Sequence, residues 1–150
     1  MEESIDLFEQ IRLGMDLENV DGNTYSPLTL AYIGDAIYEI VIRTMVVSWG
    51  NMQVNKLHKK SSNLVKAQTQ AEMAKHITDS LDDKELSVYK RGRNAKSFTK
   101  AKNASVIDYR MATGFEALMG YLYISHKSDR MMELMKTGIE LFKQDNIKEV

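Results

Sequence analysis

Hydrophobic residues recur along most of the chain with the spacing of α-helices. A first helix is predicted over residues 3–14, and a loop follows that ends at Ser26 and Pro27. Serine is a favoured N-cap, and proline suits the first helical position because its missing N–H is not needed there. A second helix is therefore predicted over residues 27–48.

The rest of the chain continues this helical pattern. A third helix is predicted over residues 53–77, and "SLDD" from Ser80 resembles a capping box for a short fourth helix that ends near Gly92. A second strongly apolar helix is predicted over residues 108–127, and Ser128 is expected to cap a last amphipathic helix. Five or six helices with a single proline predict an all-α bundle.

An acid interrupts the apolar pattern of the second helix. This helix is apolar almost all round, which predicts a central and buried place, yet Asp35 follows directly after Gly34. A buried carboxylate is costly, so Asp35 needs a partner. Asp35, Glu39 and Arg43 are spaced four apart and share one face. One interpretation is therefore a structural ion pair with arginine; the other is a ligand site.

The second apolar helix also carries an embedded acid, Glu116, close to Gly114 and Ala117. Small residues let backbones and a ligand approach closely. Oxygen ligation by carboxylates and water suits Mg²⁺, or Mn²⁺, because these hard ions retain several waters. A metal between Asp35, Glu116 and a phosphodiester can orient a water, lower its pKa and neutralise charge in the transition state.

Composition limits the class of protein. The chain has 150 residues and no cysteine, which predicts one domain over residues 1–150 without disulfides, thiolate zinc sites or a cysteine nucleophile. The N-terminus is acidic and lacks a signal-peptide pattern, and no apolar run approaches the ~20 residues that span a bilayer. We therefore expect a cytoplasmic protein that does not enter membranes.

Charge is unevenly spread. Residues 1–22 carry seven acids and one arginine, whereas residues 89–104 carry six basic residues and no acid. A basic run is often only a solvated segment, but here it is a candidate for phosphate contact. The candidates in this segment are Lys90, Arg91, Arg93 and Lys96. Lys59 and Lys60 are secondary candidates, and His58 has no second histidine at ligand spacing.

These motifs resemble the ribonuclease III family. "YIGDAIYE" around Asp35 resembles the signature helix E-R-L-E-F-L-G-D-A-V-L, and "TGFEALMGYLY" around Glu116 resembles the second acidic helix, D-x-F-E-A-L-I-G-A-I-Y. With "VNKLHKKSSNLVKAQTQAEMAKHI" and "KRGRNAKS" between them, they resemble the Mini-ribonuclease III branch over nearly the whole chain. The resemblance implies a ribonuclease III-type helical bundle without a double-stranded-RNA-binding domain, in which Asp35 and Glu116 bind Mg²⁺.

The chain also departs from the pattern of the larger enzymes of the ribonuclease III family. It has Leu28 and Ala31 where they have glutamates, and Thr113 where they have a second aspartate. Water is expected to replace the missing ligands. Glu39 is a possible outer-shell acceptor, although pairing with Arg43 is the simpler interpretation.

The resemblance implies a Mg²⁺-dependent endoribonuclease that cleaves double-stranded RNA as a homodimer, with two sites along one valley. For the mini branch, the implied substrate is the end-pairing stem of the precursor of 23S ribosomal RNA. An alternative is a non-catalytic double-stranded-RNA-binding dimer with a degenerate site. A nucleotide pyrophosphatase is a more distant alternative, because neither apolar helix has the paired acids at i and i+3 that such sites need.

Overall fold

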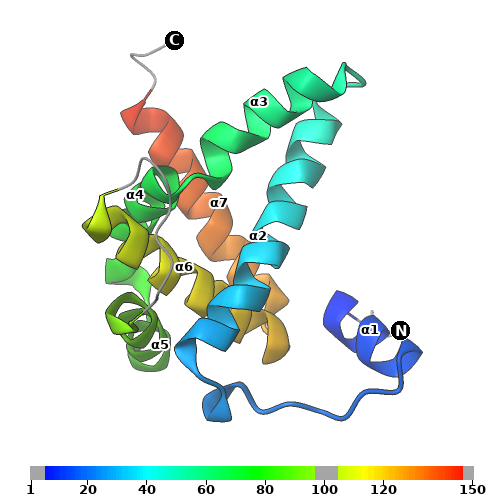
Figure 1. Ribbon diagram of the computed structural model, residues 1–150, viewed down its shortest axis with the longest axis vertical. Helices are drawn as coiled ribbons and strands as arrows, with labels where there is room; N and C mark the ends of the chain where they lie inside the picture. Colours follow the sequence, from blue (N-terminus) through cyan, green and yellow to red (C-terminus); the bar gives the residue numbers. More distant parts are fainter. Residues whose placement is uncertain (1–5, 97–104, 147–150) are drawn as a thin grey trace.

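The computed structural model describes residues 6–96 and 105–146, and this part of the chain is helical without strands (Figure 1). The all-α prediction is confirmed. The helices are α1 (Leu7–Gly14), α2 (Pro27–Ser48), α3 (Val54–Val65), α4 (Ala67–Ile77), α5 (Asp83–Asn94), α6 (Val106–Ile124) and α7 (Ser128–Asp145), with the short 3-10 helices η1 (Gly22–Thr24) and η2 (Thr78–Ser80).

Helix α6 is the centre of the bundle. Its second half, from Ala117 to Ile124, is buried at every position, and α2, α4, α5 and α7 all pack against it (Figure 1). The Ser26 side chain accepts from the Thr29 N–H at the start of α2, and Ser105 caps α6 in the same way. The predicted start of α2 is confirmed, and that of α6 lies two residues earlier than predicted.

The predicted third helix is in fact two helices. The backbone is extended at Lys66, with ψ of 154°, and the chain turns there from α3 into α4. Two side chains satisfy carbonyl groups that the break leaves without helical partners. The Thr69 hydroxyl donates to the Asn63 carbonyl at 2.5 Å, and the Gln70 amide donates to the Val65 carbonyl at 2.8 Å. Side-chain hydrogen bonds thus replace helix continuation at this point.

Helix α5 differs from its prediction at both ends. Its capping box is formed by Asp82 and Glu85, whereas Ser80 lies in η2. The Glu85 carboxylate of this capping box also forms an ion pair with Arg130 of α7, at 2.9 Å. Gly92 does not end the helix, which runs on to Asn94. Ser128 likewise is the first residue of α7 and not its cap.

The predicted burial of α2 is wrong on one side. Its inner face is buried, but an exposed apolar stripe of residues four apart follows its outer face: Leu28, Tyr32, Ala36 and Ile40. Asp35 is also exposed. The apolar pattern of α2 correctly indicated that the helix has no strongly polar face. In the structure, one of its apolar sides is nevertheless exposed to solvent. No helix in the described part of the chain is of a length and hydropathy that would cross a bilayer.

Candidate active site

Two glycines bring the backbones of α2 and α6 into contact. A Cβ atom on Gly34 would lie 1.7 Å from the Glu116 carbonyl oxygen, and one on Gly120 would lie 1.9 Å from the Leu30 carbonyl oxygen. Only glycine fits at either position, because real Cβ atoms do not approach backbone atoms this closely. The next residue after Gly34 is Asp35, so this contact brings the two predicted carboxylates to the same place.

Both carboxylates line one open pocket of about 580 Å³. Asp35 and Glu39 reach it from α2, and Glu116 reaches it from α6 together with Tyr109 and Thr113. Asp35 is exposed and Glu116 is half-buried. The sequence-predicted pair thus meets at a surface opening that a phosphodiester can reach.

The environment of Glu116 strongly disfavours its negative charge. Its pKa is raised to about 9, chiefly by burial and then by a hydrogen bond to the Asp35 carboxyl and the charge of that group. Two carboxylates this close repel each other unless a proton or a cation lies between them. Without a cation, the site therefore keeps a proton on Glu116 at neutral pH.

Gln70 was not predicted from the sequence, although it belongs to the site. It is 2% exposed, and its side chain makes a hydrogen bond to Glu116 from the interior side. This hydrogen bond lowers the pKa of Glu116 and so partly opposes the effect of burial. Its Nε2 donates to Val65, and its Oε1 atom has no hydrogen-bond partner among the described residues. The signal was present: Gln70 lies on the same helical stripe as the buried Ala74 and Ile77, where an amide is out of place.

The ion-pair interpretation of Asp35 is not supported. Arg43 is within 3.4 Å of Glu39, as the simpler interpretation expected, and both side chains are largely exposed. Among the described residues no lysine or arginine forms an ion pair with Asp35, within the 4.0 Å limit of such contacts. Asp35 is exposed, so water solvates its carboxylate and the fold does not require a buried cation beside it.

The residues at this pocket fit a divalent metal. All of the donors are oxygens, and a hydrogen bond from the Gln70 amide to Glu116 supports that carboxylate from the interior side. Within residues 6–96 and 105–146, no cluster of three or more acids or histidines is arranged to hold a metal. Ala31 and Thr113, where the larger enzymes have acids, contribute no carboxylate. Water would therefore supply much of the coordination.

Comparison with known proteins decides the family. The ribonuclease III domain matches residues 28–127. The chain belongs to the ribonuclease III family. It is 49% identical to the Mini-ribonuclease 3 of Clostridium tetani over 138 residues, 91% of each chain, and 47% identical to that of Enterococcus faecalis over 123 residues, 81% of this chain and 93% of the relative. A crystal structure of a Fusobacterium nucleatum protein is similar at a TM-score of 0.72 and 32% identity, covering 80% of this chain and 96% of that one.

As a member of the ribonuclease III family, the protein is an endoribonuclease that acts on double-stranded RNA. This family is generally dependent on a divalent metal, in agreement with the oxygen donors at the pocket. The family assignment also removes the nucleotide pyrophosphatase interpretation.

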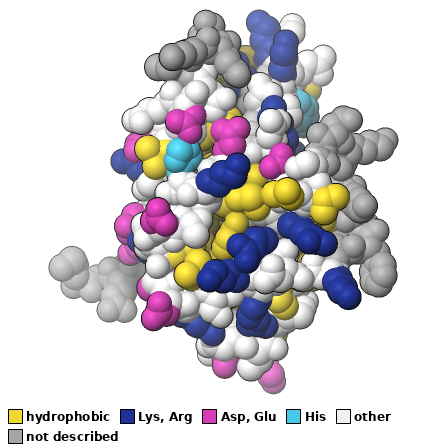
Figure 2. Space-filling model, turned by 90° about the vertical axis from the view of Figure 1, so that its left-hand side faces the viewer, with side chains coloured by type: hydrophobic (Ala, Val, Ile, Leu, Met, Phe, Trp, Pro, Cys, Tyr) yellow, Lys and Arg dark blue, Asp and Glu magenta, His cyan; other side chains and the backbone are white. Residues whose placement is uncertain are grey.

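The first part of the basic segment of this ribonuclease III family member, residues 89–94, is helix and not loop. Lys90, Arg91 and Arg93 lie in the last turns of α5, and Lys96 follows two residues after its end. Residues 97–104 of the segment lie outside the described part of the chain. Figure 2 shows basic side chains gathered on the face to which α4 and α5 contribute, around exposed apolar atoms.

Helix α5 presents this basic end close to the pocket. A Cβ on Gly92 would be 2.7 Å from the Ala117 Cβ and 3.2 Å from the Thr113 carbonyl oxygen, so α5 lies directly against the segment of α6 that carries Glu116. Its last turns therefore lie against α6 beside Thr113, which lines the pocket. The secondary candidates Lys59 and Lys60 lie elsewhere, on the exposed side of α3.

Proposed function

We propose that Asp35 and Glu116 together bind Mg²⁺, or Mn²⁺, and that this site cleaves phosphodiester bonds in double-stranded RNA. The observation that carries the proposal is that the two carboxyl groups share one pocket, where Asp35 helps to raise the pKa of Glu116 to about 9. A divalent cation relieves this repulsion, whereas a protein interior without a ligand gains nothing from it.

Each residue then has a separate task. When bound, the metal supplies an acidic water and neutralises charge on the phosphate. Exposed Asp35 is the ligand that solvent and RNA reach first, and half-buried Glu116 is the fixed ligand. Gln70 donates a hydrogen bond to the Glu116 carboxylate from the inner side and holds it in place. Glu39 lies at the rim, where it neutralises Arg43.

The apolar stripe of α2 supports a homodimer. Tyr32 is 81% exposed and Ile40 is 54% exposed, and Ile107 at the start of α6 is 70% exposed. Large apolar side chains that gather on one face are typical of a subunit interface. Leu28 and Tyr32 also line the pocket, so an isologous dimer across the stripe would bring two active sites close together, one for each strand of a duplex.

We further propose that the duplex is the end-pairing stem of the 23S ribosomal RNA precursor, and that the protein is cytoplasmic, where such a precursor is processed. The support is the resemblance to the Mini-ribonuclease III branch. The recognition work falls on basic side chains of this domain: Lys90, Arg91, Arg93 and Lys96 beside the pocket, with Lys59 and Lys60 on α3. Phosphate contacts of this kind read the shape of a duplex and not its sequence.

A cleavage assay tests the proposal. The wild-type protein should cut a duplex RNA with Mg²⁺ and not with EDTA. Asp35→Asn and Glu116→Gln keep the shape of the side chains and remove charge, so both should lose cleavage and still bind the duplex. Glu140→Gln, at an exposed position of α7, is the matched control and should cut normally. Binding without cleavage by the wild-type protein would instead establish the non-catalytic alternative.

A further inference from the structure

The single tryptophan of the chain, Trp49, is exposed at the end of α2. It is the C-cap residue of that helix and keeps 47% of its surface in solvent. Two ammonium groups lie over its ring: Lys143 Nζ of α7 at 5.4 Å and Lys60 Nζ of α3 at 5.9 Å from the centroid. An exposed indole flanked by cations is an arrangement that proteins use to hold a nucleobase and its phosphate.

The neighbouring side of α3 is a continuous basic surface. Lys56, Lys59, Lys60 and Asn63 follow one another at helical spacing and, with Met52, line a pocket of about 600 Å³. None of these lysines forms an ion pair with a described carboxylate, and neither does Lys143. Uncompensated cations around a pocket of this size favour a polyanion as the occupant.

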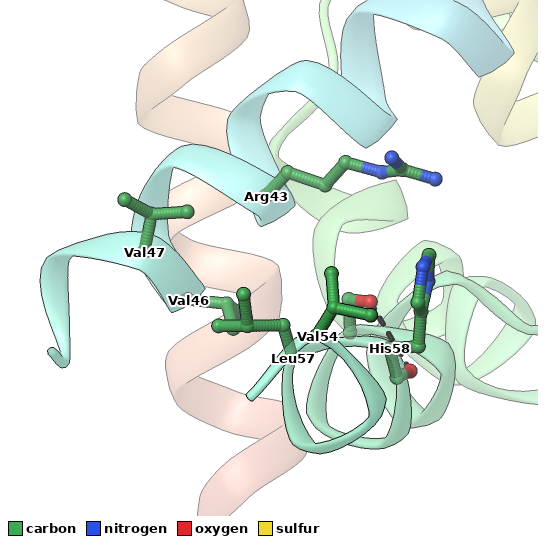
Figure 3. A pocket seen from close by; sticks show the side chains of 7 residues that line it. Arg43, Val46, Val47, Val54, Leu57 and His58 are labelled. Carbon is green, nitrogen blue, oxygen red and sulfur yellow. Dashed lines mark hydrogen bonds between the residues drawn. The ribbon is translucent and has the colours of Figure 1, made fainter. Parts of the chain in front are cut away.

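The basic surface lies on one flank of α3 and the groove between α2 and α3 lies on the other, because Lys56 and Lys60 project from the opposite side of the helix to His58. Trp49 lies beside Lys60 of this surface and follows Asp35 by fourteen residues, which corresponds to ~21 Å along α2. Arg43 and His58 extend to the same side of that groove (Figure 3), and Arg43 pairs with Glu39 at the candidate active site. The surface around Trp49 is therefore distinct from the pocket that holds the two carboxylates.

We propose that Trp49, Lys60 and Lys143 form a binding site for an unpaired nucleotide of RNA, in which the indole stacks on the base and the two ammonium groups contact the adjacent phosphates. A paired base inside a duplex offers no free face, so the indole requires a single-stranded segment. This binding does not depend on the proposed cleavage site, because none of the three residues lines the carboxylate pocket.

Fluorescence tests the stacking directly, because all tryptophan emission comes from Trp49. Titration with a short oligouridylate in EDTA should quench this emission. An abasic phosphodiester strand of the same length carries the same charge without bases and should leave it nearly unchanged. Glu116→Gln should be quenched as the wild type is, so loss of catalysis and loss of this site are separable. Equal quenching by both strands, or none by either, would overturn the proposal.

Matched variants test the contributions of the ring and the charges. In a polarisation assay with labelled oligouridylate, Trp49→Leu should bind about 5- to 100-fold more weakly. The double variant Lys60→Ala/Lys143→Ala should reduce the salt slope of binding by about 1.4, for two lost phosphate contacts. The charge-matched control, Lys84→Ala/Lys127→Ala, removes two lysines over the buried Tyr121 ring and should change neither value. Unchanged affinity in Trp49→Leu, or an equal effect in the control, would contradict a specific site.

Discussion

Replacing Glu116 with glutamine should stabilise the metal-free protein, although the same change abolishes cleavage. The ordinary pKa of this carboxyl is 4.5, and the fold raises it to about 9. Since one pKa unit corresponds to about 1.4 kcal/mol, the part of this shift between pH 4.5 and pH 7 costs the fold about 3 kcal/mol at pH 7. Glu116 borders an open pocket where water screens charge, so we expect a gain of about 1–2 kcal/mol in the free energy of unfolding.

The pH dependence has a definite sign. Between pH 4.5 and about 9 the folded protein holds a proton on Glu116 that the unfolded chain releases. This contribution to stability is fully present below pH 4.5 and is lost as the pH rises through about 9. The wild type in EDTA should therefore lose stability as the pH rises through this window, and Glu116→Gln should lack that part of the slope.

The assay is urea unfolding followed by circular dichroism at several pH values, with EDTA throughout. Glu140→Gln serves as the control, because it removes an exposed carboxylate of α7 and should follow the wild type. Identical pH slopes for the wild type and Glu116→Gln would refute the reasoning, since the fold would then not raise the pKa of Glu116.

Three further predictions concern the packing of α2 on α6, the binding of duplex RNA and the dimer interface. Gly34→Ala places a Cβ 1.7 Å from a backbone oxygen of α6 and should cost more than about 4 kcal/mol in urea unfolding, whereas Gly14→Ala meets no atom within 4 Å and should have little effect. Arg91→Ala/Arg93→Ala should weaken duplex binding and lower its salt slope by about 2; an unchanged slope would remove these residues from the RNA contact. Ile40→Glu should convert a dimer to a monomer in sedimentation at micromolar concentration, and a variant that stays dimeric would place the interface elsewhere.

The sequence predicted the parts of the fold that local pattern determines. The apolar periods over residues 27–48 and 108–127 located α2 and most of α6, and an embedded acid in each located Asp35 and Glu116. These signals are strong because a central helix must be apolar over many turns, so one charged residue stands out. The meeting of the two acids at one pocket was also predictable, since each lies beside small residues.

Features that depend on contacts between distant segments were missed. The break at Lys66 depends on side chains of the next turn, including Gln70, and has no glycine or proline to mark it. Gly92 was predicted to end a helix, whereas in the structure it allows the close packing of α5 on α6. Asp35 was predicted to be buried, but it is exposed, because hydropathy does not show which apolar face of α2 is in contact with solvent.

Anomalous diffraction from crystals soaked in Mn²⁺ tests the central claim most directly. We predict a manganese peak between Asp35 and Glu116, with an oxygen of each carboxylate at a ligand distance of about 2.0–2.3 Å and waters completing the shell. The peak should be absent from crystals of Asp35→Asn under the same conditions. Manganese bound elsewhere, with none between these two carboxylates, would contradict the assignment of this pocket as the metal centre.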